Sequence, residues 1–343
     1  MSKVIFKLEE NKDNWEQYAS SHHQANFLQS FNWGLFNHRL DKKFFPLAFL
    51  DGKKQVGAAM IIKEEAKRGN YLTIAGGPLL DWHDQHIEKI FAQFISYLQQ
   101  LAETENCHFV RIRPQAEDGE YIRNLFRQSG LKQAPMHLTA DLTLRLDLTQ
   151  SDEELMTQMS KSTRYEVRKA DRIGIETRIL KDASFMREFF EHQLYLADKH
   201  NFVPFEYNFL LKQFEQFLID DQVAFINSYY QGELLASAFV IFYHHEAVYH
   251  YGVSTEANSK LPGSYAVQWA AIKEAKQRGC KIYNFWGVSP ISNKKHRFAG
   301  PSLFKRGFGG EEVQHLWAHD LATSSWYPAI KIFESMRKKA RGL

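Results

Sequence analysis

Four cations in the segment KSTRYEVRKADR are the residues best suited to bind an anionic ligand. They are spaced 3, 4 and 4 residues apart, at Lys161, Arg164, Arg168 and Arg172. On a helix this spacing forms one basic stripe, which can contact successive phosphates of a nucleic acid or a diphosphate. The alternative is a solvated charged face whose cations pair with nearby acids, namely Glu154, Glu166 and Asp171.

A second basic segment, SPISNKKHRFAGPSLFKRGFGG, runs from residue 289 to residue 310. Its glycines predict a loop whose backbone approaches a ligand closely. Aromatic rings alternate with the cations, which suits a ligand with bases and phosphates, although the rings could equally anchor the loop in the core. The cations are Lys294, Lys295, Arg297, Lys305 and Arg306, and the rings are Phe298, Phe304 and Phe308.

Two tyrosines in the segment VYHYGVS could hold a polar ligand. Tyr249 and Tyr251 are two residues apart, so they share one face of a regular strand. The alternative is that both pack in the core with satisfied hydroxyls. The sequence contains no His-Glu-x-x-His, Cys-x-x-Cys or Gly-x-Ser-x-Gly motif, and we therefore predict neither a metal site nor a covalent nucleophile.

An approximate internal repeat indicates the elements that position these residues. FFPLAFL, VGAAMII and YLTIAG predict three strands, followed by a helix from His86 to Thr104 and the strand CHFVRIRP. VAFINSYY, LLASAFVIFY and AVYHYGV, a helix from Tyr265 to Arg278 and the strand CKIYNFWG repeat this order. Cys107 and Cys280 open the two closing strands. We predict two similar mixed α/β (α+β) domains; the alternative is a coincidence, since many α+β domains share this order.

The boundary between the domains is predicted near residue 150. The run TADLTLRLDL alternates leucine with polar residues, as a strand with one buried face does, and Ser151 and Glu154 then have the spacing of a capping box. We expect a first domain over 1–150, a second over 151–318, and a tail over 319–343 that could pack on the first. The tail ends in a basic amphipathic helix with Ile330, Ile332, Phe333 and Met336 on one side and Arg341 among its cations.

Composition limits the class of protein. The chain has 343 residues, 44% of them hydrophobic and 24% charged, and a net charge of +3, which excludes a disordered chain and a surface coated in basic residues. Two cysteines are too few for a disulfide framework. The sequence has neither a run of about 20 apolar residues nor the pattern of a signal peptide. We expect a cytoplasmic protein, with contact at the inner face of the membrane left open.

Three segments together resemble the FemABX family of peptidoglycan bridge-forming aminoacyltransferases: LRLDLTQSDEELMTQMSKSTRYEVRKADRIGIE, GSYAVQWAAIKEAKQRGCKIYNFWGV and LFKRGFGGEEV. The first half is similar only in layout, through FLQSFNWGLF and Gly76-Gly77-Pro78. The resemblance implies two tandem domains of the acyl-coenzyme A N-acyltransferase (GNAT) type with a cleft. It also implies that aminoacyl-tRNA donates an amino acid to an amino group on the stem peptide of a UDP-linked or lipid-linked precursor, with no other cofactor.

The resemblance also implies roles for individual residues. Lys305, beside Phe304, matches a lysine implicated at the reacting centre, and Tyr251 matches a tyrosine that contacts the precursor. We expect Tyr249 and Arg306 to bind substrate beside them. The stripe from Lys161 to Arg172 and the cations Lys294, Lys295 and Arg297 are then candidates for tRNA or diphosphate binding. An aminoacyl ester is already activated, so such an enzyme needs to position the amine and stabilise an oxyanion.

Four positions depart from the family pattern and concern recognition of the precursor: Asn37, Arg113, Phe205 and Phe209. Two other functions therefore stay open. One is N-acyl transfer from acyl-coenzyme A or another activated donor, to whose phosphate loops the fragment from Arg306 to Gly309 is faintly similar. The other is a protein that binds the precursor or RNA without catalysis.

Overall fold

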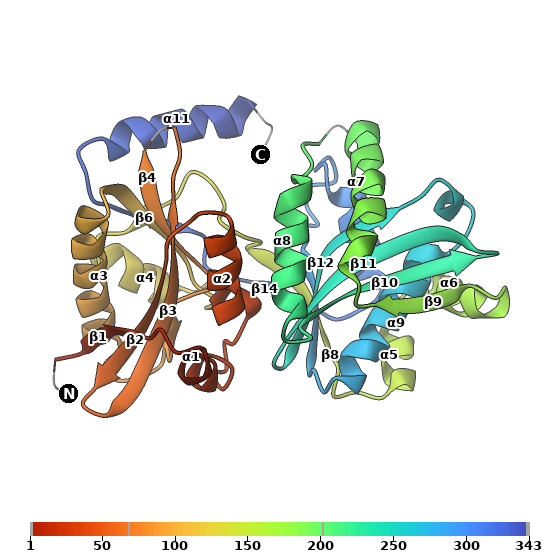
Figure 1. The fold of residues 1–343 in the computed structure, drawn as a ribbon, viewed down its shortest axis with the longest axis horizontal. Coiled ribbons are helices and arrows are strands. Elements are labelled where there is room, and N and C mark those ends of the chain that lie inside the picture. Colours follow the sequence, from red (N-terminus) through yellow and green to blue (C-terminus); the bar gives the residue numbers. More distant parts are fainter. Residues whose placement is uncertain (1–2, 68, 201, 341–343) are drawn as a thin grey trace. The chain divides into compact units, whose positions relative to one another are not determined.

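The computed structural model describes residues 3–67, 69–200 and 202–340. The chain divides into two compact units (Figure 1). Unit 1 comprises Met1–Asp141 and Gln314–Leu343, and unit 2 comprises Leu142–Val313. Each unit contains one mixed β-sheet with helices packed on it. The predicted mixed α/β class and the predicted division into two similar domains are confirmed.

The sheet of unit 1 has the strand order β1-β2-β3-β4-β6-β15-β7, with β5 paired to β3. Strands β4 and β6 are parallel, and the flanking pairs are antiparallel. The strands are β1 (Ile5–Leu8), β2 (Phe44–Asp51), β3 (Lys54–Glu64), β4 (Asn70–Ala75), β5 (Leu79–Leu80), β6 (Cys107–Arg113), β7 (Lys132–Gln133) and β15 (His319–Ala322).

Helices cover both faces of this sheet. Long apolar side chains of α3 (Ile87–Thr104) and α4 (Glu120–Gln128) pack on one face, with Phe91, Phe94 and Phe126 fully buried. On the other face lie α1 (Lys12–Ala19), the short helix η1 (Phe27–Gln29) and α2 (Phe31–Arg39). The final helix, α11 (Tyr327–Ala340), packs on Phe109 of β6.

Unit 2 has the strand order β14-β8-β13-β12-β11-β10-β9. Its strands are β8 (Leu142–Asp147), β9 (Glu176–Leu180), β10 (Val223–Tyr230), β11 (Glu233–Tyr243), β12 (Glu246–Ser254), β13 (Ile282–Gly287) and β14 (Glu311–Gln314). Helices α5 (Asp152–Gln158), α6 (Lys161–Arg172), α9 (Gly263–Gln277) and α10 (Ala299–Arg306) pack on one face. The other face is covered by α7 (Met186–His200) and α8 (Tyr207–Leu218), as Figure 1 shows.

The two sheets repeat the same arrangement. In unit 1 the antiparallel strands β2, β3 and β4 are followed by α3 and by β6, which returns parallel to β4. In unit 2 the strands β10, β11 and β12 are followed by α9 and by β13, which returns parallel to β12. Cys107 opens β6, Cys280 lies two residues before the start of β13, and both are buried and free. The two closing strands belong to separate sheets.

The boundary between the two units differs from the predicted one because one strand belongs to the second unit rather than the first. The alternating leucines do form a strand, but β8 lies between β13 and β14 of unit 2, so the boundary falls at Asp141 rather than near residue 150. Leu144 and Leu146 are buried in the core of unit 2, which explains the pairing. The equivalent place in unit 1, between β6 and β7, is taken by β15 from the end of the chain. Each sheet is therefore completed by the strand that follows the other repeat.

The predicted capping box at Ser151 is confirmed at the start of α5.

The tail belongs to unit 1, where a buried ion cluster holds it. Arg111 Nε donates to Asp320 Oδ1 at 2.7 Å, and Arg111 Nη2 donates to Glu334 Oε2 at 2.7 Å. Tyr327 and Ile330 are buried beside the cluster, so Ile330 faces the sheet and does not share a side with Ile332, Phe333 and Met336, which are exposed. Arg341 and the two residues after it lie outside the described residues. Among the helices described, none is both long enough and apolar enough to cross a bilayer.

Candidate active site

The parallel strands of unit 2 separate part of the way along their length. Strands β12 and β13 pair from Glu246 and Ile282 as far as Val248 and Asn284, and no pairing continues beyond. In unit 1 the equivalent strands stay paired to the end of β4, at Ala75 and Arg113. A fork between parallel strands leaves main-chain polar groups without a neighbouring strand, so it can admit a ligand. We call the opening after Val248 and Asn284 the fork.

The two candidate tyrosines lie at the fork but on opposite faces of the sheet. Tyr251 pairs with Phe239 and Tyr249 pairs with Val240, so two neighbouring residues of β11 face three of β12 and His250 is the extra residue of a β-bulge. Tyr249 therefore packs in the core under α9 and α10, whereas Tyr251 contacts Phe239 at 5.4 Å between ring centroids. The expectation that both tyrosines share one face is wrong, because the bulge breaks the alternation.

Lys305 contacts both arms of the fork. Its Nζ donates to the carbonyl oxygen of Gly287 at the end of β13, at 2.7 Å, and lies 5.7 Å from the ring centroid of Tyr249 on β12. Burial lowers the pKa of the Lys305 ammonium to about 8 and raises the pKa of Tyr249 to about 12. Lys305 is therefore at the fork beside Tyr249, whereas Tyr251 faces the other side of the sheet.

Aromatic packing fixes the helix that carries Lys305. The second basic segment contains α10 between two loops, so Lys305 lies in a helix rather than in a free loop. Phe304 meets Tyr265 at 5.1 Å, and buried Phe308 meets Phe285 at 5.3 Å between ring centroids. These two rings anchor the segment in the core, as the second of the two interpretations expects.

The glycines that follow α10 contact protein, not an open ligand site. A Cβ on Gly307 would lie 2.2 Å from Thr163 Oγ1 of α6, and one on Gly310, whose φ is +86°, would lie 2.3 Å from the carbonyl oxygen of Arg145. The carbonyl oxygen of Gly307 also accepts from Ser160 N, at the start of α6. The predicted close approach of backbone to a ligand is therefore replaced by a close approach to α6 and β8.

The predicted basic helix is confirmed as α6, and its stripe carries few contacts. Lys161, Arg168 and Arg172 are exposed and Arg164 is half-buried. Within the described residues none of the four makes an ion pair; Arg172 lies over the ring of Tyr165 at 6.0 Å. The acids expected to neutralise the stripe are engaged elsewhere or solvated: Glu154 caps α5 and Glu166 pairs with Lys169.

The remaining cations of the second basic segment divide into two groups. Lys294, Lys295 and Arg297 are exposed in the loop before α10, where Arg297 lies over the ring of Phe298 at 4.4 Å. Arg306 instead pairs with Glu312, and its Nη2 donates to the carbonyl oxygen of Ser289 at 2.6 Å. Arg306 therefore holds the ends of the segment together.

The face of the fork that carries Tyr251 has an aromatic shelf. We give this name to Phe205, Phe209 and Tyr251. The rings of Phe205 and Phe209 stack at 5.2 Å between centroids, and Phe205 meets Tyr251 at 5.1 Å. Two of the four departures from the family pattern thus lie together beside Tyr251, and they make this side of the fork apolar.

A buried chain of polar groups that was not predicted from the sequence lies beneath the fork. Asn284 Nδ2 donates to Glu246 Oε1 at 2.9 Å, and Asn284 Oδ1 accepts from the backbone N–H of Trp286 at 2.8 Å. This bond holds Trp286 at a φ of +64°, a left-handed conformation that is uncommon outside glycine. The ring of Trp286 meets His250, whose pKa burial lowers to about 3. The sequence feature that could have predicted this chain is the presence of Glu246 and Asn284 within otherwise apolar strands.

The other two departures are structural parts of unit 1. Arg113 is buried, lies 3.7 Å from Asp141 and donates to Gln115 Oε1 at 2.6 Å. Asn37 is buried at the end of α2, where its Nδ2 donates to the carbonyl oxygen of Trp33 at 2.9 Å. Neither side chain is available to a ligand in this structure.

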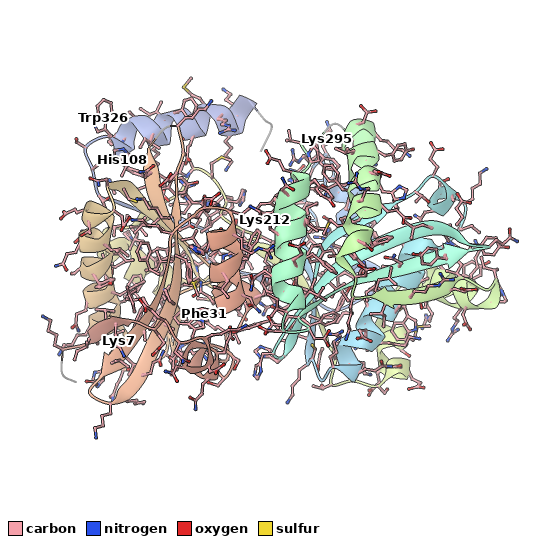
Figure 2. The ribbon with its side chains drawn as sticks, viewed as in Figure 1. Lys7, Phe31, His108, Lys212, Lys295 and Trp326 are labelled. Atoms are coloured by element: carbon pink, nitrogen blue, oxygen red, sulfur yellow. The ribbon has the colours of Figure 1, made fainter. Side chains whose placement is uncertain are left out.

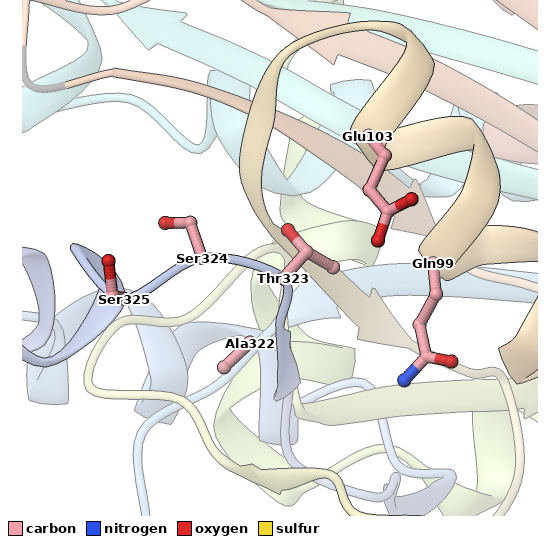
Figure 3. Close-up of a pocket in the computed structure, with 6 residues that line it drawn as sticks. All are labelled: Gln99, Glu103, Ala322, Thr323, Ser324 and Ser325. Carbon is pink, nitrogen blue, oxygen red and sulfur yellow. The ribbon is translucent and has the colours of Figure 1, made fainter.

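Outside the fork, one polar hollow of about 490 Å³ lies in unit 1 (Figure 3). It is lined by Gln99, Glu103 and the segment from Ala322 to Ser325, none of which the sequence singles out. Among the side chains that the structure describes, no group of three or more His, Cys, Asp or Glu residues could hold a metal ion.

Comparison with known proteins gives both a family and a fold. The FemAB family model matches residues 11–125 and 210–332. Aminoacyltransferase FemA of Staphylococcus epidermidis is 29% identical over 104 residues, which is 30% of this chain and 24% of that protein. Aminoacyltransferase FemA of Staphylococcus aureus is 38% identical over 71 residues, or 21% of this chain and 17% of that protein. The matched segment thus spans a quarter or less of these relatives.

Solved structures match the whole fold. A crystal structure of FemX superposes with a TM-score of 0.85, covering 97% of this chain and 100% of that chain at 14% identity. A tandem GNAT protein from the clavulanic acid biosynthesis pathway superposes with a TM-score of 0.59 over 94% of this chain and 99% of that chain, at 9% identity. The two units are therefore tandem GNAT-like domains, as the resemblance implies.

Proposed function

Because the chain belongs to the FemAB family, we propose that it is an aminoacyltransferase that builds peptidoglycan bridges. The donor is aminoacyl-tRNA and the acceptor is an amino group on the stem peptide of a peptidoglycan precursor. The reaction takes place in the cytoplasm, where charged tRNA is made, and it needs no other cofactor because the aminoacyl ester is already activated.

The observation that carries this proposal is the position of Lys305 across the fork. The acceptor amine attacks the ester carbonyl carbon, a C–N bond forms, and negative charge develops on the carbonyl oxygen. An ammonium held between the Gly287 carbonyl and the Tyr249 ring can donate to that oxyanion in a site of low polarity. The intermediate then collapses: the C–O bond to the tRNA ribose breaks, the amine loses a proton and the ribose oxygen gains one.

The basic stripe of α6 supports tRNA as the donor. Its cations have no acidic partner in the described part of the chain, and α6 begins where α10 ends, since Ser160 N donates to the carbonyl oxygen of Gly307. A tRNA backbone bound along α6 would therefore be coupled to the helix that carries Lys305. Lys294, Lys295 and Arg297, exposed in the loop before α10, extend the set of candidate phosphate contacts.

Transfer from acyl-coenzyme A is the competing function on this fold. Such a donor needs a glycine-rich loop whose N–H groups are open to a pyrophosphate at the start of a helix. The glycines after α10 follow a helix instead and are packed against Thr163 and Arg145. This packing favours aminoacyl-tRNA over acyl-coenzyme A.

The proposal is tested by incubating the protein with mixed charged tRNAs and either UDP-linked or lipid-linked precursor, followed by mass spectrometry for an added amino acid. We expect Lys305→Met to lower kcat by about 100-fold to 1,000-fold, the loss seen when one oxyanion donor is removed, with KM little changed. Lys305→Arg keeps the charge and serves as the matched control. A product formed from acyl-coenzyme A but not from charged tRNA would contradict the proposal.

A further inference from the structure

One side of α11 is buried and another side is exposed. Tyr327, Ile330 and Glu334, spaced three and four residues apart, are buried on unit 1. Lys331 and Lys338 are half-buried, and large apolar side chains at and just before the helix are exposed. Trp326, Ile332, Phe333 and Met336 are 67%, 63%, 51% and 65% exposed, respectively.

These exposed side chains form one surface. Ile332 and Met336, four residues apart, lie on the side of the helix away from the buried residues, and Trp326 and Phe333 lie at the edge of that side, four residues before and three residues after buried Ile330. Figure 2 labels Trp326 beside the start of α11. We call Trp326, Ile332, Phe333 and Met336 the outer face of α11. Exposed apolar side chains gathered on one helix face, rather than scattered, mark an interaction surface.

The exposed charges on α11 are of one sign. Glu334 is the one acidic residue between Trp326 and Ala340, and it is buried on Arg111 at 2.7 Å. Arg337 and Lys339 are exposed beside the apolar residues. Lys331 donates to the carbonyl oxygen of Gln133, and Lys338 lies over the ring of Trp317 at 5.1 Å. The helix therefore combines bulky apolar groups with cations, and the described part of its exposed side presents no carboxylate of its own.

The partner that fits this combination is an anionic bilayer. An amphipathic helix with Trp and Phe on one side and Lys and Arg at its margins lies in the membrane interface, with its apolar side among the acyl chains and its cations on anionic headgroups. We propose that the outer face of α11 docks unit 1 on an anionic membrane surface. The buried ion pairs of Arg111 fix the helix on the sheet, so the face is presented as a rigid surface. The inference does not depend on the proposed function.

The test is co-sedimentation of the full chain with vesicles of phosphatidylcholine alone and with an equal mixture of phosphatidylcholine and phosphatidylglycerol. We expect binding to the anionic vesicles that weakens in high salt. Phe333→Ser with Met336→Ser should lower the partition coefficient by tenfold or more, at roughly 0.8 kcal/mol per buried CH₂. Arg337→Gln with Lys339→Gln should lower it by about 25-fold on anionic vesicles only, at about 1 kcal/mol per cation.

The controls distinguish binding through the outer face of α11 from non-specific adsorption to vesicles. Ile219 is equally exposed, at 69%, but lies in unit 2, so Ile219→Ser should leave the partition unchanged. A blue shift of tryptophan emission on binding should shrink in Trp326→Phe while that variant still binds. Failure of the protein to bind anionic vesicles would overturn the inference. So would a wild-type dimer that Phe333→Ser with Met336→Ser dissociates, because the occupant would then be a second copy of the chain.

Discussion

Two contacts, with the carbonyl oxygen of Gly287 and with the ring of Tyr249, hold the Lys305 side chain in a buried site. Burial there favours the neutral amine over the ammonium. Burial lowers its pKa from 10.5 to about 8, so between these pH values the unfolded chain holds a proton that the folded chain has lost. The free energy of unfolding therefore rises with pH across this window, and below about pH 8 the cost of the buried charge is fully present. A catalytic ammonium at this site is one that the fold destabilises.

This cost predicts a stabilising variant. At about 1.4 kcal/mol per pKa unit, reduced for the lost hydrogen bond to Gly287 and for partial exposure, we expect Lys305→Met to raise the free energy of unfolding near pH 7 by about 1–2 kcal/mol. The gain should vanish above about pH 10.5, where the lysine is neutral in both states. Urea denaturation at the two pH values measures this. Equal effects at both would show that the ammonium is not desolvated.

We expect a change in the aromatic shelf to alter the KM for the acceptor, the peptidoglycan precursor, and not the KM for charged tRNA. Phe205 is 47% exposed and stacks on Phe209 while touching Tyr251. Removing one ring of such a pair costs about 0.5–1.5 kcal/mol, so Phe205→Ala should raise the KM for the precursor by roughly two- to tenfold. The KM for charged tRNA should not change. Val203→Ala, at a neighbouring exposed position, is the control, and an equal rise of both KM values would contradict the assignment.

At the scale of elements, α6 predicts how donor binding depends on salt. Each phosphate that a cation neutralises adds about 0.7–0.9 to the slope of log affinity against log salt. Replacing Arg164 and Arg168 with Gln should therefore weaken tRNA binding and reduce the slope by about 1.4–1.8. Lys169→Gln on the same helix is the control, since Lys169 pairs with Glu166. Filter binding over a salt series measures the slope, and an unchanged slope would make the stripe a solvated face.

Elements that depend on the spacing of residues near in sequence could be predicted, whereas features that depend on which strands pair could not. The capping box at Ser151 and the helix that carries Arg164 follow from spacing alone. The bulge at His250 does not, because an extra residue in β12 is specified by its partner β11. The alternating leucines predict a strand but not its sheet, since β8 could pair in either unit by the same pattern. Spacing therefore did not reveal that Tyr249, and not Tyr251, is the tyrosine beside Lys305.

At the scale of the whole molecule, unit 2 is a continuous segment inserted in unit 1. Leu142–Val313 contains the strands of its own sheet except Gln314, the last residue of β14, whereas unit 1 needs Gln314–Leu343 to supply β15 and α11. Without that segment, Arg111 loses both Asp320 and Glu334, and Phe109 loses Tyr327 and Ile330, which pack on it. When the segment is packed but one partner of the buried ion pair is removed, the loss is about 3–5 kcal/mol, a large share of the stability of one domain.

We therefore expect the two units to differ as isolated fragments. A fragment of residues 142–313 should unfold cooperatively on its own, because its sheet and both helical layers are within it. A fragment of residues 1–141 should not fold alone, since its sheet lacks the strand between β6 and β7. Coexpression with residues 314–343 should restore it, whereas the same peptide carrying Asp320→Leu should not, because Arg111 would again be left without its bidentate partner. Circular dichroism and thermal denaturation of each fragment measure this. A fragment 1–141 as stable alone as with the peptide would show that β15 adds nothing to the fold of unit 1.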